Sequence, residues 1–206
     1  MRILMCLLFF GTASAANHTN DGWITLFDGS SLHGWLASES KNTFQLHDGI
    51  LVVKGDRSHL FYVGDVNGGK FRNFELKIDV KTEHNANSGI YLHTAYQETG
   101  WPEKGFEIQI NNADKDPRKT GSLYGVSDLA ESPIRTGEWF TTHIIVQGKK
   151  ITVKIDDRTV VEWEQPDDWS GTSDFPQRKI DAGTFALQGH DPDSTVYYRN
   201  IRVKNR

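Results

Sequence analysis

The chain has 206 residues, with 23 Lys and Arg against 27 Asp and Glu, which gives a net charge of −4. A mildly acidic chain with scattered basic residues lacks the positive surface that nucleic acid requires, so we exclude nucleic acid as a partner. Hydrophobic residues make up 37% of the chain, enough for a sizeable core, and the length suits one domain.

The first residues are typical of a secretory signal peptide. Arg2 is a short basic start, Ile3 to Phe10 is an apolar run, and Ala13 to Ala15 is a small-residue cleavage site. The apolar run is too short to span a bilayer. We therefore expect an exported protein, periplasmic or extracellular, that has no membrane anchor once residues 1–15 are removed.

The rest of the chain reads as one folded unit. Residues 16–22 form a polar leader that we predict to be disordered, and 23–206 a single domain, since no repeat or change in composition marks a second one. Cys6 is the only cysteine and lies in the signal peptide. The exported chain would therefore have no disulfide and would depend on its core alone.

Short alternating segments, separated by Gly, Asn and Asp turns, follow one another along this domain. Successive side chains of a strand point to opposite faces, so apolar and polar residues in alternation indicate a strand with one buried face. The predicted strands are 23–28, 43–46, 50–53, 60–63, 71–80, 87–96, 105–111, 120–125, 139–147, 150–156, 158–163, 183–188 and 195–203. No segment has a sustained helical period. The pattern predicts an all-β fold, a two-sheet antiparallel sandwich of the jelly-roll type.

The segment 105–111, Gly-Phe-Glu-Ile-Gln-Ile-Asn, is the most informative strand. Its apolar residues can enter the core, while Glu107, Gln109 and Asn111 line up on the other face. One carboxylate beside two carboxamides offers many hydrogen-bonding groups and little charge, which suits a sugar-contacting surface. The alternative interpretation is an ordinary solvated strand face.

Two other strands have outward residues that we expect beside this row. Alternation places Tyr91 and His93 on one face of 87–96, and Gln188 and His190 lie at the end of the strand 183–188. Sequence does not determine the register between strands, so the adjacency of the three rows is a hypothesis. For each histidine the alternative is a hydrogen-bonded structural role.

Three aromatic residues are candidates for stacking on a sugar ring: Tyr91, Trp101 and Tyr124. An aromatic face suits the apolar C–H face of a pyranose. Each of these side chains could equally pack in the core or within a loop.

Familiar hydrolytic arrangements fit the sequence poorly. A retaining β-glucanase places two carboxyl groups about 5–5.5 Å apart on one strand face, but Glu107 is the only carboxylate in its row. There is no nucleophile elbow, phosphate-binding loop or closely spaced metal motif. The ordinary two-carboxylate mechanism is therefore not supported.

A series of motifs nevertheless resembles a known family throughout the predicted domain. The motifs are 22–35 (GWITLFDGSSLHGW), 73–76 (NFEL), 86–90 (ANSGI), 106–110 (FEIQI), 120–125 (TGSLYG), 137–139 (GEW), 187–190 (LQGH) and 198–203 (YRNIRV). Together they resemble the 3-keto-disaccharide hydrolase family. The chain departs from this family at His93, where Arg is common, and near Asn111, where Asp is common.

The resemblance implies a concanavalin-like jelly roll that acts on glycosides oxidised at C3. A ketone at C3 acidifies the C2 proton, so that a base can remove it and the C1 oxygen can leave, without a carboxylate nucleophile. On this basis Glu107 and His190 are the candidate acid and base. The candidate substrate-binding residues are Asn87, Tyr91, His93, Trp101, Gln109, Tyr124 and Gln188.

The resemblance leaves alternatives open. A divalent metal bound by Glu107 and a histidine could instead stabilise the enolate, although no ligand spacing in the sequence indicates it. A protein of another class, a non-catalytic carbohydrate-binding domain, would use the same groove without turnover. A conventional glycoside hydrolase is the third alternative, disfavoured by the missing second carboxylate.

Overall fold

The structure is a computed structural model that describes residues 21–113 and 115–206. The predicted signal peptide and most of the predicted leader lie outside these residues. The described strands are β1 (Ile24–Phe27), β2 (Trp35–Ala37), β3 (Phe44–His47), β4 (Ile50–Val53), β5 (Ser58–Tyr62), β6 (Phe74–Thr82), β7 (Asn87–Thr94), β8 (Phe106–Asn111), β9 (Trp139–Gln147), β10 (Lys150–Ile155), β11 (Arg158–Glu164), β12 (Thr184–Gly189) and β13 (Val196–Asn205). Two short 3₁₀ helices, η1 (Lys41–Thr43) and η2 (Val66–Gly69), accompany them. In these ranges no helix is long and apolar enough to cross a membrane.

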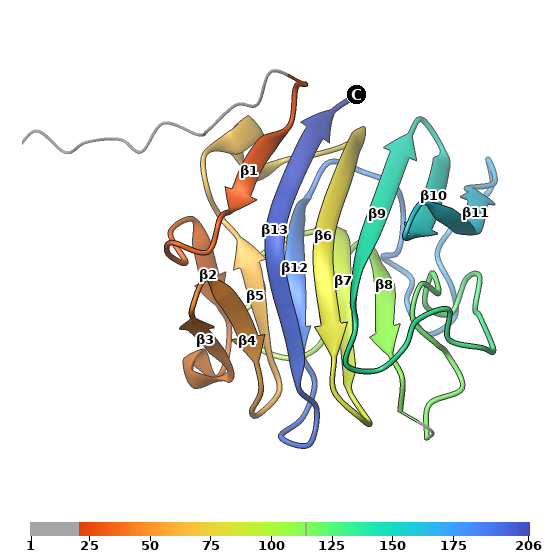
Figure 1. Cartoon of the computed structure of the whole chain (residues 1–206). Coiled ribbons are helices and arrows are strands. Elements are labelled where there is room, and N and C mark those ends of the chain that lie inside the picture. Colours follow the sequence, from red (N-terminus) through yellow and green to blue (C-terminus); the bar gives the residue numbers. More distant parts are fainter. Residues whose placement is uncertain (1–20, 114) are drawn as a thin grey trace, which may run out of the picture.

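The strands form two antiparallel sheets that lie face to face (Figure 1). The larger sheet has the order β11-β10-β9-β6-β13-β4-β3, with β1 also paired to β13. The smaller has the order β2-β5-β12-β7-β8. Strands distant in sequence, such as β6 and β13, thus become neighbours, as in other sandwiches with crossing connections. The predicted all-β jelly-roll sandwich is confirmed.

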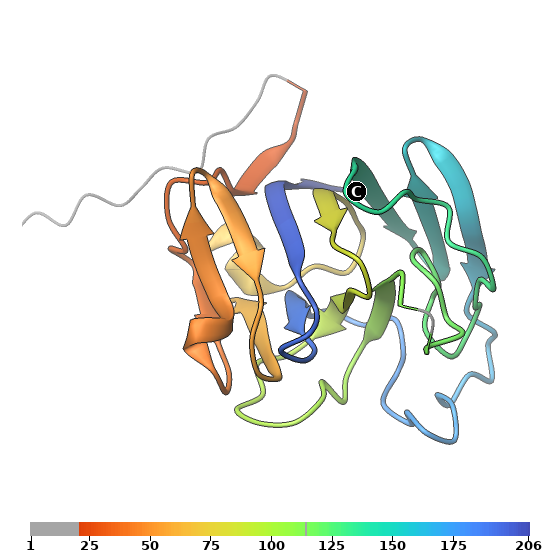
Figure 2. The ribbon, with the colours of Figure 1, turned by 60° about the horizontal axis from the view of Figure 1, so that its bottom comes forward.

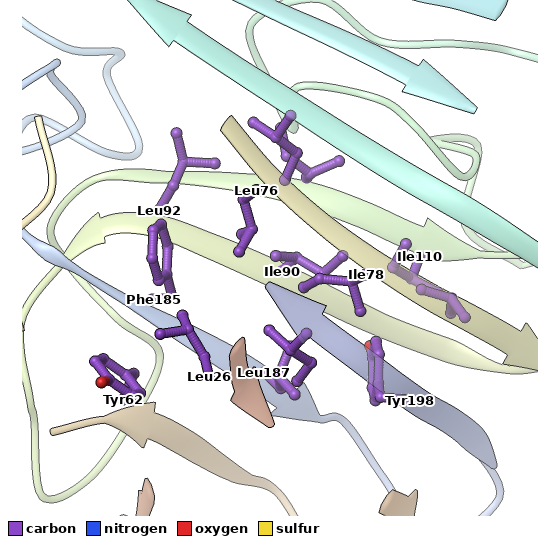
Figure 3. Packing of buried hydrophobic residues seen from close by; sticks show 14 of the residues in the cluster. Leu26, Tyr62, Leu76, Ile78, Ile90, Leu92, Ile110, Phe185, Leu187 and Tyr198 are labelled. Atoms are coloured by element: carbon purple, nitrogen blue, oxygen red, sulfur yellow. The ribbon is translucent and has the colours of Figure 1, made fainter. Parts of the chain in front are cut away.

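The core lies between the two sheets. The apolar residues of β8, Phe106, Ile108 and Ile110, are fully buried, and they face residues of the larger sheet such as Leu76 and Ile78. Figure 3 shows Ile110 of β8 in the same layer as Leu76 and Ile78 of the larger sheet. Because each strand alternates, the same register that buries the apolar set turns the polar set of the five-stranded sheet to its outer face.

Two predicted elements differ from the structure. Segment 120–125 is not a regular strand, since Gly121 has a φ of 92° and only isolated bridges join Leu123 to Ile108 and Ser127. Residues 35–37, which lie outside the predicted strands, form β2 at the edge of the smaller sheet. A three-residue strand is too short for alternation to reveal it.

Candidate active site

The outer face of the five-stranded sheet brings together polar rows from its central strands. In the register between β7 and β8, Tyr91 pairs with Glu107 and Gly89 with Gln109. On the other side of β7 lies β12, which carries Gln188. The hypothesis that these rows are adjacent is confirmed by the register.

A cavity of about 160 Å³ opens on this face. The loops after β7, β8 and β11 contribute to its wall. Figure 2 shows the loop after β7 and the long loop after β11 running along the same lower side of the molecule. The lining residues are Asn87, Tyr91, Trp101, Pro102, Glu107, Gln109, Asp116, Tyr124, Phe175, Arg178, Gln188 and His190. They include every predicted site residue except His93. Their chemical roles remain predictions.

His93 does not join the row of Tyr91, and this corrects the expectation from alternation. Its φ is 57°, a left-handed conformation that breaks the alternation of β7. The ring packs against Phe74 at 5.5 Å, and Nε2 lies 3.0 Å from the carbonyl oxygen of Arg72. Burial lowers the pKa of His93 to about 4. The residue is therefore held as a neutral imidazole away from the cavity.

Glu107 is the centre of the site and is only 5% exposed. The Tyr91 hydroxyl donates to its Oε2 at 3.0 Å, and Gln188 Nε2 donates to its Oε1 at 3.1 Å. Gln188 Nε2 also lies 3.1 Å from the Tyr91 hydroxyl oxygen, so the three side chains form a closed network. The carboxylate lies over Gly89, where any Cβ would overlap Oε1. A glycine at this position is thus a requirement of the site rather than of the backbone.

Arg178 lines the cavity but was not predicted from the sequence. Its guanidinium is almost completely buried, and Nη2 lies 3.7 Å from Glu107 Oε2. It packs 3.6 Å above the ring of Phe175 and donates to the carbonyl oxygen of Tyr124. Arg178 comes from the long Pro- and Asp-rich loop, which has no periodicity from which its burial could have been predicted.

Burial sets the protonation chemistry of this pair. It raises the pKa of the Glu107 carboxyl above its ordinary value, and the positive charge of Arg178 is the largest opposing influence. Burial also lowers the pKa of Arg178. A carboxyl group whose pKa is raised towards neutrality is suited to both giving and accepting a proton.

His190 is oriented by its neighbour Asp191. Nδ1 of the ring lies 2.5 Å from Asp191 Oδ2, and that carboxylate also accepts hydrogen bonds from the Ser194 hydroxyl and backbone. Although burial opposes it, hydrogen bonds from His190 and Ser194 lower the pKa of Asp191. With Nδ1 engaged by a carboxylate, Nε2 is the nitrogen available for proton transfer.

A second carboxylate enters the cavity from the loop after β8. Asp116 Oδ2 accepts a hydrogen bond from Gln109 Nε2 at 3.3 Å, and the same nitrogen donates to Asn87 Oδ1 at 3.2 Å. Glu107 is the only carboxylate on its strand, as predicted, but the cavity contains two. Asn111 instead supports this loop, since its Nδ2 donates to the carbonyl oxygen of Arg118 at 2.6 Å.

The aromatic residues form the walls of the cavity. Tyr124 lies between two guanidinium groups, with Arg118 at 4.5 Å and Arg178 at 5.3 Å from its ring centre. Trp101 is 41% exposed, and Arg57 lies 5.3 Å from the centre of its ring. An exposed indole above a polar floor is the arrangement expected of a sugar-stacking surface.

The predicted alternative of a metal ion finds limited support in the side chains present. Within residues 21–113 and 115–206, no three His, Cys, Asp or Glu side chains are grouped so that they could hold an ion. Glu107 is already engaged by Arg178, Tyr91 and Gln188. We therefore derive no chemical step through a metal.

Known proteins resemble this chain in sequence and in fold. The curated 3-keto-disaccharide hydrolase of Bacteroides thetaiotaomicron is 26% identical over 230 residues, which cover 89% of this chain and 78% of the relative. Two crystal structures of candidate glycosyl hydrolases from Parabacteroides distasonis share the fold. One has a TM-score of 0.77 at 23% identity and covers 90% of this chain and 94% of its own. The other has a TM-score of 0.69 at 25% identity, and the match covers 89% of this chain and 99% of that structure's chain.

A family model described as the 3-keto-alpha-glucoside-1,2-lyase-like domain matches residues 22–204. The match spans both sheets and all the strands that line the cavity. The chain belongs to this family.

Proposed function

We propose that this protein is an exported enzyme that cleaves 3-keto disaccharides by elimination followed by addition of water. As a member of its family the chain is a glycoside-cleaving enzyme. The observation that carries the finer proposal is that two oriented proton-transfer groups, Glu107 and His190, line one small cavity with the buried cation Arg178.

The proposed chemistry needs no carboxylate nucleophile. A base removes the proton from C2 of the keto sugar, and the electron pair moves onto the C3 oxygen as an enolate. When the enolate collapses, the bond between C1 and the glycosidic oxygen breaks, and an acid protonates the departing oxygen. Collapse restores the C3 ketone and leaves a double bond between C1 and C2, and water then adds its hydroxyl to C1 and its proton to C2, which gives the free 3-keto sugar. The site must supply one base, one acid and a stabiliser of the enolate.

His190 and Glu107 fit the first two roles. Because Asp191 engages Nδ1 of His190, the Nε2 lone pair is free to accept the C2 proton. Glu107, whose pKa burial raises, is suited to protonate the leaving oxygen. Arg178 is the nearest cation to this carboxyl and would stabilise the enolate.

The carboxamides of the cavity fit sugar hydroxyls as acceptors. The Nε2 atoms of Gln109 and Gln188 are already used within the site, whereas the Oε1 atoms of both are buried and have no hydrogen-bond partner in the described part of the chain. Sugar hydroxyls would donate to these two oxygens.

The test uses purified protein with 3-keto-trehalose and a 3-keto-glucoside, each beside the unoxidised sugar, with and without chelator. We expect sugar release from the keto substrates only. Comparable cleavage of the unoxidised glycosides would contradict elimination. Binding without release from either substrate would favour a carbohydrate-binding module, and loss of activity in chelator would assign the enolate-stabilising role to a metal.

Export is a separate part of the proposal, supported by the composition of the first 15 residues. Expression of the full chain in a bacterial host, followed by mass analysis of the periplasmic fraction, would detect cleavage after Ala15 or Ala16. An intact Met1 in the cytoplasmic fraction alone would contradict export.

A further inference from the structure

His59 is a buried histidine that the proposed mechanism does not use. It lies on β5 with its side chain on the outer face of the five-stranded sheet, and it pairs in register with Gln188 of β12. Its exposed fraction is 0%. Neither ring nitrogen has a hydrogen-bond partner among the described residues.

Packing does not account for an imidazole at this position. A neutral imidazole always has one N–H donor and one acceptor, and burying either without a partner costs free energy. A phenylalanine ring would fill the same space without that cost, and the next outward residue of β5 is indeed Phe61. An unsatisfied polar group of this kind in a folded protein calls for a functional explanation.

The neighbours of His59 connect it to the cavity. Its ring lies 5.4 Å from Tyr91 and 5.5 Å from Trp101, in both cases edge to face. Both aromatic residues line the cavity, and Tyr91 binds Glu107 directly. Across the strand pair, Gln188 binds the same carboxylate. His59 therefore lies directly beneath the wall of the active site.

Trp101 is the cover that separates His59 from the cavity. It belongs to the loop between β7 and β8 rather than to a strand, and 41% of it is exposed. Among residues 21–113 and 115–206, its ring contacts are with other rings and a cation: His59 below, His190 at 5.2 Å and Arg57 at 5.3 Å. A ligand that displaces the indole would open a path to the two free nitrogens of His59.

We propose that His59 is a substrate-binding residue, covered by Trp101 in the free protein and reached by a sugar hydroxyl when Trp101 moves aside. A hydroxyl is both a donor and an acceptor, so it matches either nitrogen of a neutral imidazole. The ligand class is thus a hydroxyl-rich sugar, and this inference rests on the proposed function. It adds β5 to the three strands, β7, β8 and β12, whose outward side chains form the proposed sugar-binding surface.

The first test compares His59→Phe and His59→Gln with the wild type on 3-keto-trehalose. Phe preserves the ring packing and removes both polar atoms, so we expect kcat/KM to fall about tenfold while the melting temperature stays equal or rises. Gln retains a donor and an acceptor, and its kcat/KM should lie between the other two. An unchanged kcat/KM in the Phe variant, or equal losses of stability and activity in both variants, would overturn the proposal.

The second test measures whether Trp101 shields His59 from a reagent in solution. Labelling with diethyl pyrocarbonate, followed by peptide mass mapping, should modify His59 at least about tenfold faster in Trp101→Ala than in the wild type, and 3-keto-trehalose should slow it. His93, buried and outside the cavity, is the internal control. A His59 that stays unlabelled in Trp101→Ala, or is labelled equally with and without sugar, would contradict the inference. Failure of the wild type to cleave any keto sugar would instead contradict the proposed function.

Discussion

The two halves of the candidate active site are built in different ways. One half stands on strands: Glu107, Tyr91 and Gln188 come from three neighbouring strands, and the ladder of backbone hydrogen bonds fixes their spacing. The other half stands on loops: Arg178 and Trp101 reach the cavity from segments with no regular structure. The strands supply a rigid hydrogen-bonded carboxylate, and the loops supply the charge and the cover that act on it.

The largest expected effect comes from removing the positive charge of Arg178, which a loop supplies to the site. Arg178→Met leaves the Glu107 carboxylate buried without its cation, so we expect a loss of about 3–5 kcal/mol in the free energy of unfolding at neutral pH. The loss should shrink as the pH falls, because protonation of Glu107 removes the unpaired charge. Urea unfolding at several pH values checks this, with Arg158→Met on exposed β11 as control. Equal stability of Arg178→Met and wild type would show that the two halves are energetically independent.

Two buried histidines of the strands, His59 and His93, should make the protein less stable in acid. Burial lowers the pKa of each to about 4, whereas the ordinary value is 6.5. The unfolded chain therefore binds more protons between these pH values, and stability is lost as the pH falls from about 6.5 to about 4, by about 3 kcal/mol per histidine.

His59→Phe should remove the part of this acid-dependent loss of stability that comes from His59 and keep the part that comes from His93. Around His59, Glu39 opposes the shift, while Arg57 and His190 reinforce it, so the unfolding series is best run at fixed ionic strength. The same acid slope in the variant and the wild type would show that His59 does not titrate in this range.

Glu107→Gln tests the strand half alone. The substitution keeps the shape and most hydrogen bonds but cannot transfer a proton, so kcat/KM on a 3-keto sugar should fall by at least about a hundredfold with the fold intact. Steady-state kinetics and circular dichroism measure the two quantities, and Glu162→Gln on β11 is the matched control. An unchanged rate would remove Glu107 from the mechanism.

The smallest expected effect concerns the position of the carboxylate. In Gly89→Ala the new methyl group overlaps Oε1 of Glu107, so the carboxylate must shift while the strands stay paired. We expect kcat/KM to fall about tenfold with a much smaller change in melting temperature. If the melting temperature falls and activity per folded molecule is unchanged, Gly89 serves the sheet rather than the site.

The same division explains what sequence could predict. Strict alternation in β8 was enough to place Glu107 and Gln109 on the outer face, and the strand rows proved adjacent because register follows from burial. The prediction was wrong for His93, where a positive φ reverses the alternation. Arg178 and Asp116 were missed because loop residues have no periodicity, and His59 because its strand begins two residues earlier than expected.

The irregular segment at 120–124 has a consequence for the behaviour of the protein in solution. Its backbone bonds to the outer edge of β8, with Gln109 N donating to Ser122 O at 3.0 Å and Tyr124 N donating to Glu107 O at 3.0 Å. The strand that carries the central carboxylate would otherwise end its sheet with unpaired backbone groups, which is where chains associate edge to edge. By occupying those groups the segment protects β8 from aggregation, and it leaves the face that carries Glu107 open.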